Sequence, residues 1–331
     1  MSKATNDLEG GAPRAAGDGT YDVVVVGAGA AGLNAALLLG RARRRVVVLD
    51  AGEPRNAPAS HMHGFLSRDG LPPARLLELG RAEIARYGVG LVRGRVERID
   101  HGYDVRMVGG PVLRTRRVLV ATGLRDELPD IPGVRQRWGK DVLHCPYCHG
   151  YEVRDQPLAV LGTGPGAVHQ ALLVRQWSDD VVFFTHTLEL SSRDRERLEA
   201  SGLRIVAGRV AQVVVDGGRL RGIELADGSL VPRAAAFVFP RMVPQDDLLT
   251  GLGCAKDDNG WIVTDRTSRT SVAGVWAAGN VIDSRAQVVT AAGMGSAAAF
   301  AINGDLLEED VEHAVGRHRK VFGATVPEAG R

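Results

Sequence analysis

Hydrophobic positions near the start of the chain predict a strand, a glycine turn, a helix and a second strand. The stretch "YDVVVVGAGAAGLNAALLLGRARRRVVVLD" opens with an apolar, β-branched run and ends in a strand that carries Asp50. Gly27, Gly29 and Gly32 lie between the two strands, at the start of a segment with helical spacing of apolar residues. This order predicts a βαβ unit whose glycines let a pyrophosphate approach the helix N-terminus. An acid at the end of the second strand suits a ribose 2′-hydroxyl and would repel a 2′-phosphate.

The same pattern recurs in "QPLAVLGTGPGAVHQALLVRQWSDDVVFFTHT", with Gly162, Gly164 and Ala167 at the turn. Two such units predict an α/β protein with two Rossmann-like dinucleotide-binding domains. The second strand of this copy runs into "FFTHT", without an acid to select NAD or an immediate arginine cluster to hold a 2′-phosphate. We therefore expect a degenerate nicotinamide site at Gly162, Gly164 and Ala167, and NAD(P)H is a doubtful cofactor.

Three arginines follow the second unit in "SSRDRERLEA", namely Arg193, Arg195 and Arg197. They alternate with acids, which is typical of a solvent-exposed helix face rather than of a phosphate site. Beyond them, "LRIVAGRVAQVVVDGGRLRGIELADGSLVP" predicts strands separated by turns at "DGG" and "DGS". The later stretch "AQVVTAAGMGSAAAFAING" predicts a buried packing helix, because it is rich in Gly and Ala and short of strong hydrophobes.

Composition limits the classes of function. A chain of 331 residues usually forms two domains, and its net charge of +2 gives no bulk electrostatic reason to bind nucleic acid or an anionic membrane. Residues 1–20 are polar and lack an apolar core segment, so we expect a disordered tail rather than a signal peptide. Three cysteines make no disulfide framework, which favours a cytoplasmic protein with a catalytic or metal-binding pair.

Two cysteines lie close together in "VLHCPYCHGYEV", where Cys145 and Cys148 are flanked by His144 and His149. A structural zinc needs four ligands and the chain has no second CxxC, so we expect no metal site. Two inert core thiols are also unexpected, because Pro, Tyr and His are not core-filling neighbours, whereas Cys254 alone fits a buried position. The spacing favours a redox couple whose thiolate an adjacent imidazole can generate by taking a proton.

Taken together, the motifs resemble those of the low-molecular-weight thioredoxin reductase family of FAD-dependent disulfide oxidoreductases. They are the early GxGxxG, "RRVLVATG", a CxxC just before the second GxGxxA, and the late "TSVAGVWAAGN". The resemblance covers about residues 21–325. It implies that the first unit binds FAD, that Ala121–Gly123 mark the crossing between domains, and that the late motif returns the chain to the FAD domain.

The resemblance therefore predicts two Rossmann-like domains of three-layer ββα type, the second inserted into the first. The expected boundaries are a tail at 1–20, FAD-binding residues 21–127, an inserted NAD(P)-binding-like domain at 128–244 with the CxxC, FAD-binding residues 245–325 and a tail at 326–331.

The resemblance also implies which residues contact FAD. They are Gly27, Gly29, Ala30, Ala31, Gly32, Asp50, Arg55, Val96, Ala121, Thr122, Gly123, Gly279, Asn280, Gln287 and Val288. A helix beginning near Gln287 would present free N–H groups that stabilise the anion formed on flavin reduction. At Asn280 the family usually has Asp; Asn can still bond a ribityl hydroxyl, so we expect FAD binding of somewhat altered strength.

Within the family, Cys148 is implied to pass electrons to the flavin while Cys145 exchanges with substrate. Ordinary thioredoxin reductases resemble one another in an Asp after the second cysteine and an "HRRxxxR"-like motif, where this chain has His149 and "THTLELS". Both departures are similar to the dithiol oxidases of gliotoxin, holomycin and romidepsin type. That group implies a small-molecule dithiol as substrate, His144 or His149 as base, and oxygen as final acceptor.

Alternatives remain open at this stage. One is a reductase that delivers electrons from NADPH or another donor to a thioredoxin-like protein, and another is a redox sensor without turnover. A homodimer is implied by the resemblance. In "RNAPASHMHGFLSRDG", His61 and His63 either reach the flavin or a substrate pocket, or are ordinary surface histidines.

Overall fold

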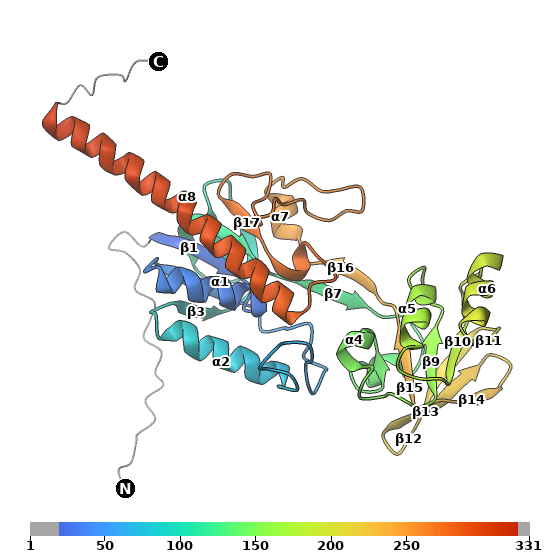
Figure 1. Cartoon of the computed structure of the whole chain (residues 1–331). Coiled ribbons are helices and arrows are strands. Elements are labelled where there is room, and N and C mark those ends of the chain that lie inside the picture. Colours follow the sequence, from blue (N-terminus) through green and yellow to red (C-terminus); the bar gives the residue numbers. More distant parts are fainter. Residues whose placement is uncertain (1–19, 324–331) are drawn as a thin grey trace, which may run out of the picture. The chain divides into compact units, whose positions relative to one another are not determined.

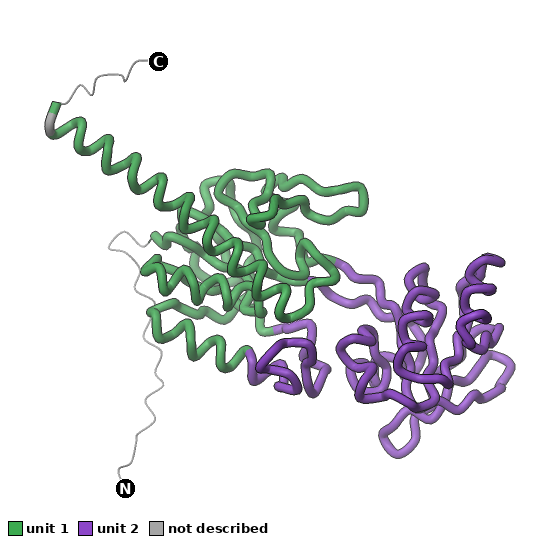
Figure 2. The backbone as a smooth tube through the Cα atoms, in the orientation of Figure 1, with its two compact units in different colours: residues 1–52, 77–123, 244–331 green, residues 53–76, 124–243 purple. Residues whose placement is uncertain are grey.

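The computed structural model describes residues 20–323. Most of the predicted tail at 1–20, and the tail at 326–331, lie outside this range. The chain divides into two compact units (Figure 2). Among the described residues, unit 1 consists of 20–52, 77–123 and 244–323, and unit 2 of Glu53–Leu76 and Leu124–Val243.

Unit 1 contains a seven-stranded sheet in which β1 and β6 are central. Figure 1 labels β1, β3 and β17 of this sheet. Its strands are β3 (Gly90–Arg93), β2 (Val46–Asp50), β1 (Thr20–Val26), β6 (Val112–Val120), β5 (Asp104–Met107) and β4 (Val96–Ile99), with β17 (Val275–Ala277) also paired to β6. Strands β3, β2, β1, β6 and β17 are parallel, whereas β5 and β4 are antiparallel additions. The late motif thus returns as β17 beside β6, so the discontinuous fold predicted for this unit is present.

The first strand shows why the sheet is buried on both faces. In β1, Val23 and Val25 pack into one apolar cluster with α1 (Ala30–Arg41) and α8 (Val288–Phe322), while Val24 and Val26 pack into another. The second cluster includes Leu249 of α7 (Asp247–Gly251). Successive side chains point to opposite faces, so a continuous apolar strand needs cover on both. Helix α2 (Pro73–Ala85) adds Leu77 and Ile84 to the first cluster.

The helix predicted from small residues is confirmed, and it is longer than that stretch, since α8 runs for 35 residues. Its small residues let it approach α1 backbone to backbone: a Cβ placed on Gly295 would lie 2.0 Å from the carbonyl oxygen of Ala31. No helix within residues 20–323 is both long and apolar enough to span a membrane.

Unit 2 has a five-stranded parallel sheet between a helical layer and an antiparallel meander. The sheet order is β11 (Arg204–Val206), β10 (Val181–Phe184), β9 (Leu158–Leu161), β15 (Ala235–Val238) and β8 (Val142–Leu143). The meander consists of β12 (Val210–Asp216), β13 (Arg219–Leu225) and β14 (Leu230–Pro232). On the helical side lie α4 (Pro146–His149), α5 (Ala167–Val174) and α6 (Ser192–Ala200), whereas Val134 of α3 (Val134–Arg137) packs in the cluster that contains the meander residues. The turns predicted at "DGG" and "DGS" separate the meander strands as expected.

The unit division differs from the predicted boundaries mainly at residues 53–76; residues 124–127 also group with unit 2, and residue 244 with unit 1. Residues 53–76 group with unit 2, although the sequence-based boundaries put them in the FAD-binding part. Contacts within unit 2 account for the grouping, because Arg55 pairs with Asp126 at 2.8 Å and His63 lies 3.4 Å from Glu152. Strands β7 (Leu124–Glu127) and β16 (Arg241–Pro244) form the two-stranded connection at the edge of this unit.

We predict opposite effects from two glycine substitutions in α8. Gly295→Ala should lower the free energy of unfolding by about 3 kcal/mol, because its new methyl group would overlap backbone atoms of α1. Gly304→Ala is the control: its Cβ would meet nothing within 4 Å, and Ala favours the helix by about 0.5–1 kcal/mol. Urea unfolding of both variants measures the difference, and equal stability of the two would contradict the packing described for α1 and α8.

Candidate functional site

The turn between β1 and α1 is built from backbone contacts that only glycine permits. Gly27 has a φ of 107°, and a Cβ there would lie 2.4 Å from the carbonyl oxygen of Ala121. A Cβ on Gly32 would lie 1.9 Å from the carbonyl oxygen of Gly27. These contacts hold the first turn of α1 directly against the ends of β1 and β6.

Gly29 differs from its neighbours because its missing side chain leaves open space. It is the N-cap of α1, no side chain bonds the helix end there, and a Cβ would meet nothing within 4 Å. Ala30 and Ala31 follow as the first residues of the helix. Uncapped N–H groups beside such a space fit the diphosphate of FAD, with Gly29 supplying the close approach and α1 its positive end.

Asp50 lies at the end of β2, as predicted, and its carboxylate has several partners. One oxygen accepts the N–H of Gly52 at 3.2 Å, and the other pairs with Arg93 at 3.1 Å and Arg81 at 3.4 Å. The arginines come from positions more than 30 residues away, and the sequence pattern did not indicate them. Contact between Asp50 and a ribose stays a prediction, and Arg81 and Arg93 fix the orientation of the carboxylate.

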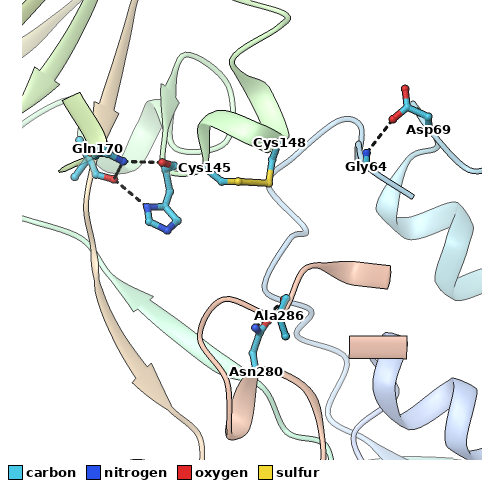
Figure 3. The surroundings of a disulfide bond; sticks show 9 residues. Gly64, Asp69, Cys145, Cys148, Gln170, Asn280 and Ala286 are labelled. Atoms are coloured by element: carbon cyan, nitrogen blue, oxygen red, sulfur yellow. Dashed lines mark hydrogen bonds between the residues drawn. A yellow bond between two sulfur atoms is a disulfide. The ribbon is translucent and has the colours of Figure 1, made fainter. Parts of the chain in front are cut away.

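The late motif forms a tight loop in front of α8. Gly279 has a φ of 82°, and the Asn280 amide donates to the carbonyl oxygens of Asp283 and Ala286, both at 2.9 Å. Figure 3 shows Asn280 next to Ala286. Gln287 is then the N-cap of α8, which begins at Val288 as predicted. Asn280 therefore shapes the loop that presents the N-terminus of α8, a role that the sequence analysis did not assign to it.

The remaining predicted FAD residues fall at three places. Thr122 donates its hydroxyl to the carbonyl oxygen of Gln245 at 2.6 Å, and the Gly123 carbonyl accepts the Gln245 N–H at 2.9 Å. These bonds tie together the two crossing segments next to Ala121. Val96 is the first residue of β4. Arg55 makes a two-pronged ion pair with Asp126, both bonds being 2.8 Å.

The CxxC lies on a short helix that follows β8. Cys145 is the N-cap of α4, Pro146 is its first residue, and Cys148 lies on its single turn. The two cysteines form a disulfide with their Cα atoms 5.2 Å apart (Figure 3). Cys254 is a buried free thiol, as predicted. Among residues 20–323 no group of three or more His, Cys, Asp or Glu side chains could hold a metal ion.

The two histidines beside the disulfide have different surroundings. His144 contacts the Val238 carbonyl through Nδ1 at 3.4 Å and packs edge-on to the Phe239 ring. Burial, followed by the nearby Arg55 charge, lowers the pKa of His144 below its ordinary value. Burial also lowers the pKa of His149, against the opposing carboxylate of Glu152. Both imidazoles are therefore mainly neutral at pH 7 and able to accept a proton.

His63 connects two carboxylates near His149. Its Nδ1 lies 3.3 Å from Asp69, and its Nε2 lies 3.4 Å from Glu152. Asp69 also accepts the N–H of Gly64 at 2.9 Å, which fixes its loop (Figure 3). The sequence left His61 and His63 unassigned; the structure exposes His61 and places His63 in this carboxylate chain. Glu152 was missed by sequence reasoning, although it follows His149 by only three residues.

The second glycine turn lacks part of a dinucleotide grip. A Cβ on Gly162 would lie 2.5 Å from the Thr185 carbonyl, whereas Gly164 faces open space. The next residue, Pro165, has no N–H to offer a phosphate. Arg209 lies near enough to His186, just beyond β10, to lower the pKa of that histidine, although burial contributes more. Ala167 is buried at the start of α5.

The arginines that follow the second βαβ repeat lie on the exposed face of α6, as predicted. Arg195 and Arg197 make loose ion pairs with acids of the same helix, at 3.8 Å and 3.5 Å, and Arg193 is also exposed.

Comparison with known proteins supports the geometry. A family model described as pyridine nucleotide-disulphide oxidoreductase matches residues 21–295. A crystal structure of HlmI is 62% identical, with a TM-score of 0.90 over 93% of this chain and 98% of HlmI. An oxidoreductase from Agrobacterium tumefaciens is 37% identical, with a TM-score of 0.82 over 87% of this chain and 99% of its own. "Thioredoxin reductase sirT" of Leptosphaeria maculans is 32% identical over 88% of this chain and 96% of its own length.

We predict that Gly29→Ala weakens FAD binding without loss of the fold. The new methyl group would enter the open space at the N-terminus of α1, so the FAD dissociation constant should rise about tenfold or more, which corresponds to about 1.4 kcal/mol. Fluorescence titration of the apoprotein with FAD measures the change. Gly304→Ala should bind FAD as the wild type does, and an unchanged dissociation constant for Gly29→Ala would refute the assignment of this space.

We also predict that Glu152→Gln lowers the pKa of His149 further. The Glu152 carboxylate favours the imidazolium form, so its removal should move the titration midpoint of His149 to lower pH. NMR titration of isotope-labelled histidine measures this midpoint, with exposed Glu189→Gln as the control. A higher midpoint in the Glu152 variant would contradict the electrostatic arrangement described here.

Proposed function

Because the chain belongs to the pyridine nucleotide-disulphide oxidoreductase family and is an FAD-dependent disulfide oxidoreductase, we propose that it oxidises a small-molecule dithiol to an intramolecular disulfide, with oxygen as final acceptor. The observation that carries the proposal is the pair of partly buried imidazoles that flank the two cysteines in the sequence, His144 before Cys145 and His149 at the end of α4. A neutral imidazole can deprotonate an incoming thiol near neutral pH, whereas an ionised carboxylate at the His149 position would be a weaker base.

The proposed exchange proceeds in two attacks at the cysteine pair. A substrate thiolate attacks the Cys145 sulfur, the Cys145–Cys148 bond breaks, and Cys148 leaves as a thiolate. The second substrate thiol then attacks the substrate sulfur of the mixed disulfide, which closes the substrate disulfide and releases Cys145. Two protons pass from the substrate thiols to His144 and His149 or to solvent. The assignment of Cys145 to substrate and Cys148 to the flavin side follows the family resemblance.

FAD, when bound, supplies the two-electron acceptor that connects the reduced cysteine pair with oxygen. The overall balance is one dithiol and one oxygen converted to one disulfide and one hydrogen peroxide. Within the protein, Gly29, Ala30 and the N-terminus of α1 would hold the diphosphate, and the N-terminus of α8 at Val288 would offer N–H groups to developing negative charge.

The second glycine turn, at Gly162 and Gly164, disfavours NADPH as the electron donor of a reductase. It therefore supports the oxidase, in which oxygen is the electron acceptor. Pro165 removes one N–H from the turn, and the end of β10 carries Thr185 and His186 instead of a row of arginines. The alternative, a reductase for a thioredoxin-like protein, is supported by relatives that are named as thioredoxin reductases, such as sirT. Such a reductase would use the charge of Arg209, beside His186, to bind the 2′-phosphate of NADPH.

A homodimer is part of the proposal. Phe300, Leu307 and Val311 are 73%, 55% and 44% exposed and recur along α8 at spacings that place them on one stripe. A second copy that packs on this stripe would remove it from water. Light scattering that gives the mass of one chain at micromolar concentration would exclude the dimer.

A cytoplasmic location stays a prediction.

Anaerobic reduction of the purified protein tests the direction of electron flow. We expect a small dithiol to bleach the flavin absorbance, with recovery of the colour and one equivalent of hydrogen peroxide when air is admitted. Cys145→Ser should abolish bleaching by the dithiol, because the attacked sulfur is gone, while Cys254→Ala should retain it. Rapid bleaching by micromolar NADPH, without bleaching by the dithiol, would overturn the oxidase proposal and favour the reductase.

A further inference from the structure

A buried glutamine lies behind the histidine that precedes the redox pair. Gln170 of α5 is 3% exposed, and its amide nitrogen donates to the carbonyl oxygen of His144 at 2.6 Å (Figure 3). The same nitrogen lies 3.3 Å from the carbonyl oxygen of Val238. Both neighbours are carbonyl oxygens, which only accept, so the NH₂ group of Gln170 must face them.

The Val238 carbonyl also contacts the His144 ring. Nδ1 of His144 lies 3.4 Å from this oxygen, a long hydrogen bond. A carbonyl oxygen cannot donate, so the bond exists only when Nδ1 carries the proton. In the neutral ring the other nitrogen, Nε2, is then the one with a free electron pair. The Phe239 ring, edge-on to His144 with centroids 5.2 Å apart, restrains the same imidazole from another side.

Gln170 therefore contacts two carbonyl oxygens that position His144. One is the carbonyl of His144 itself, and the other is that of Val238, which accepts the hydrogen bond from Nδ1 of the ring. A buried glutamine is destabilising unless both polar atoms of its amide have hydrogen-bond partners. Its Oε1 atom is buried and has no hydrogen-bond partner among the described residues. Leaving such an acceptor unpaired costs about 1–3 kcal/mol, which offsets the stabilisation from the two bonds that the amide nitrogen donates, so the side chain contributes little net stability.

We propose that Gln170 is a positioning residue that holds His144 in the tautomer with its proton on Nδ1, so that Nε2 is the nitrogen that accepts the thiol proton. The catalytic part of the inference rests on the proposed role of His144 as a base, whereas the tautomer does not depend on the direction of electron flow. The charged and titratable groups that influence His144 are Arg55, Asp126 and His149. Gln170 is uncharged, so its effect is geometric and differs from theirs.

The tautomer can be measured directly in the holoprotein. Long-range nitrogen–proton NMR of ¹⁵N-histidine protein at pH 8 distinguishes Nδ1–H from Nε2–H, and His144→Gln identifies the His144 signal among the nine histidines. We expect Nδ1–H in the wild type and a mixture of tautomers in Gln170→Leu. Gln176→Leu makes the same chemical change at an exposed position shortly after α5 and should match the wild type. Gln170→Met provides a second variant if the leucine variant does not fold.

The rate of flavin bleaching by a small dithiol gives the catalytic readout on the same proteins. Misplacement of a catalytic group commonly costs up to about 100-fold, so we expect Gln170→Leu to be slower by about 10- to 100-fold at pH 8 with an unchanged melting temperature. A wild-type ring protonated on Nε2, or an unchanged tautomer in Gln170→Leu and Gln170→Met, would overturn the proposal. A changed tautomer with an unchanged rate would overturn its catalytic part and remove His144 as the base, while the oxidase proposal would still stand on dithiol bleaching and peroxide formation.

Discussion

Close contact between backbones around the first turn of α1 is the constraint on which unit 1 depends. Gly27 lies against the carbonyl of Ala121, Gly32 against that of Gly27, and Gly295 of α8 against that of Ala31. Each contact lacks the space for a single methyl group. The strand ends, α1 and α8 therefore meet at one place, whereas the uncapped N-terminus of α1 at Gly29 faces open space.

Close backbone packing does not determine the surroundings of α4. There, polar neighbours distinguish the imidazoles of His144 and His149. His144 is oriented by neutral carbonyl oxygens and an aromatic edge, whereas His149 lies near the Glu152, His63 and Asp69 chain. A hydrogen bond to a neutral carbonyl oxygen favours one tautomer with little effect on charge, while a nearby carboxylate favours the protonated ring. The two histidines thus differ in what fixes their protonation: the tautomer of His144 is set by a carbonyl oxygen, and the protonated form of His149 is favoured by Glu152. Each nevertheless has a lowered pKa.

The sequence predicted those features that are local in the chain. The β1–Gly27–α1 order, the start of α8 after Gln287, the meander turns and the exposed arginines of α6 follow from short-range patterns, and the structure agrees with them. Partners brought together by folding could not be read in this way. Gln170 reaches the carbonyl of Val238 across 68 positions, and Arg93 reaches Asp50 across 43. Nothing in a helical spacing distinguishes a buried glutamine with a partner from one facing solvent.

The segmented construction of unit 1 has a consequence for synthesis on the ribosome. Both segments of unit 2 precede residue 244, whereas β17 and α8 of unit 1 come after it. Translation at about 5–20 residues per second leaves an interval of seconds in which unit 2 can fold while α1 still lacks its partner helix. A nascent chain therefore presents its cysteine pair before its FAD-binding unit is complete, and in that interval the redox conditions around the ribosome determine whether the pair is oxidised or reduced.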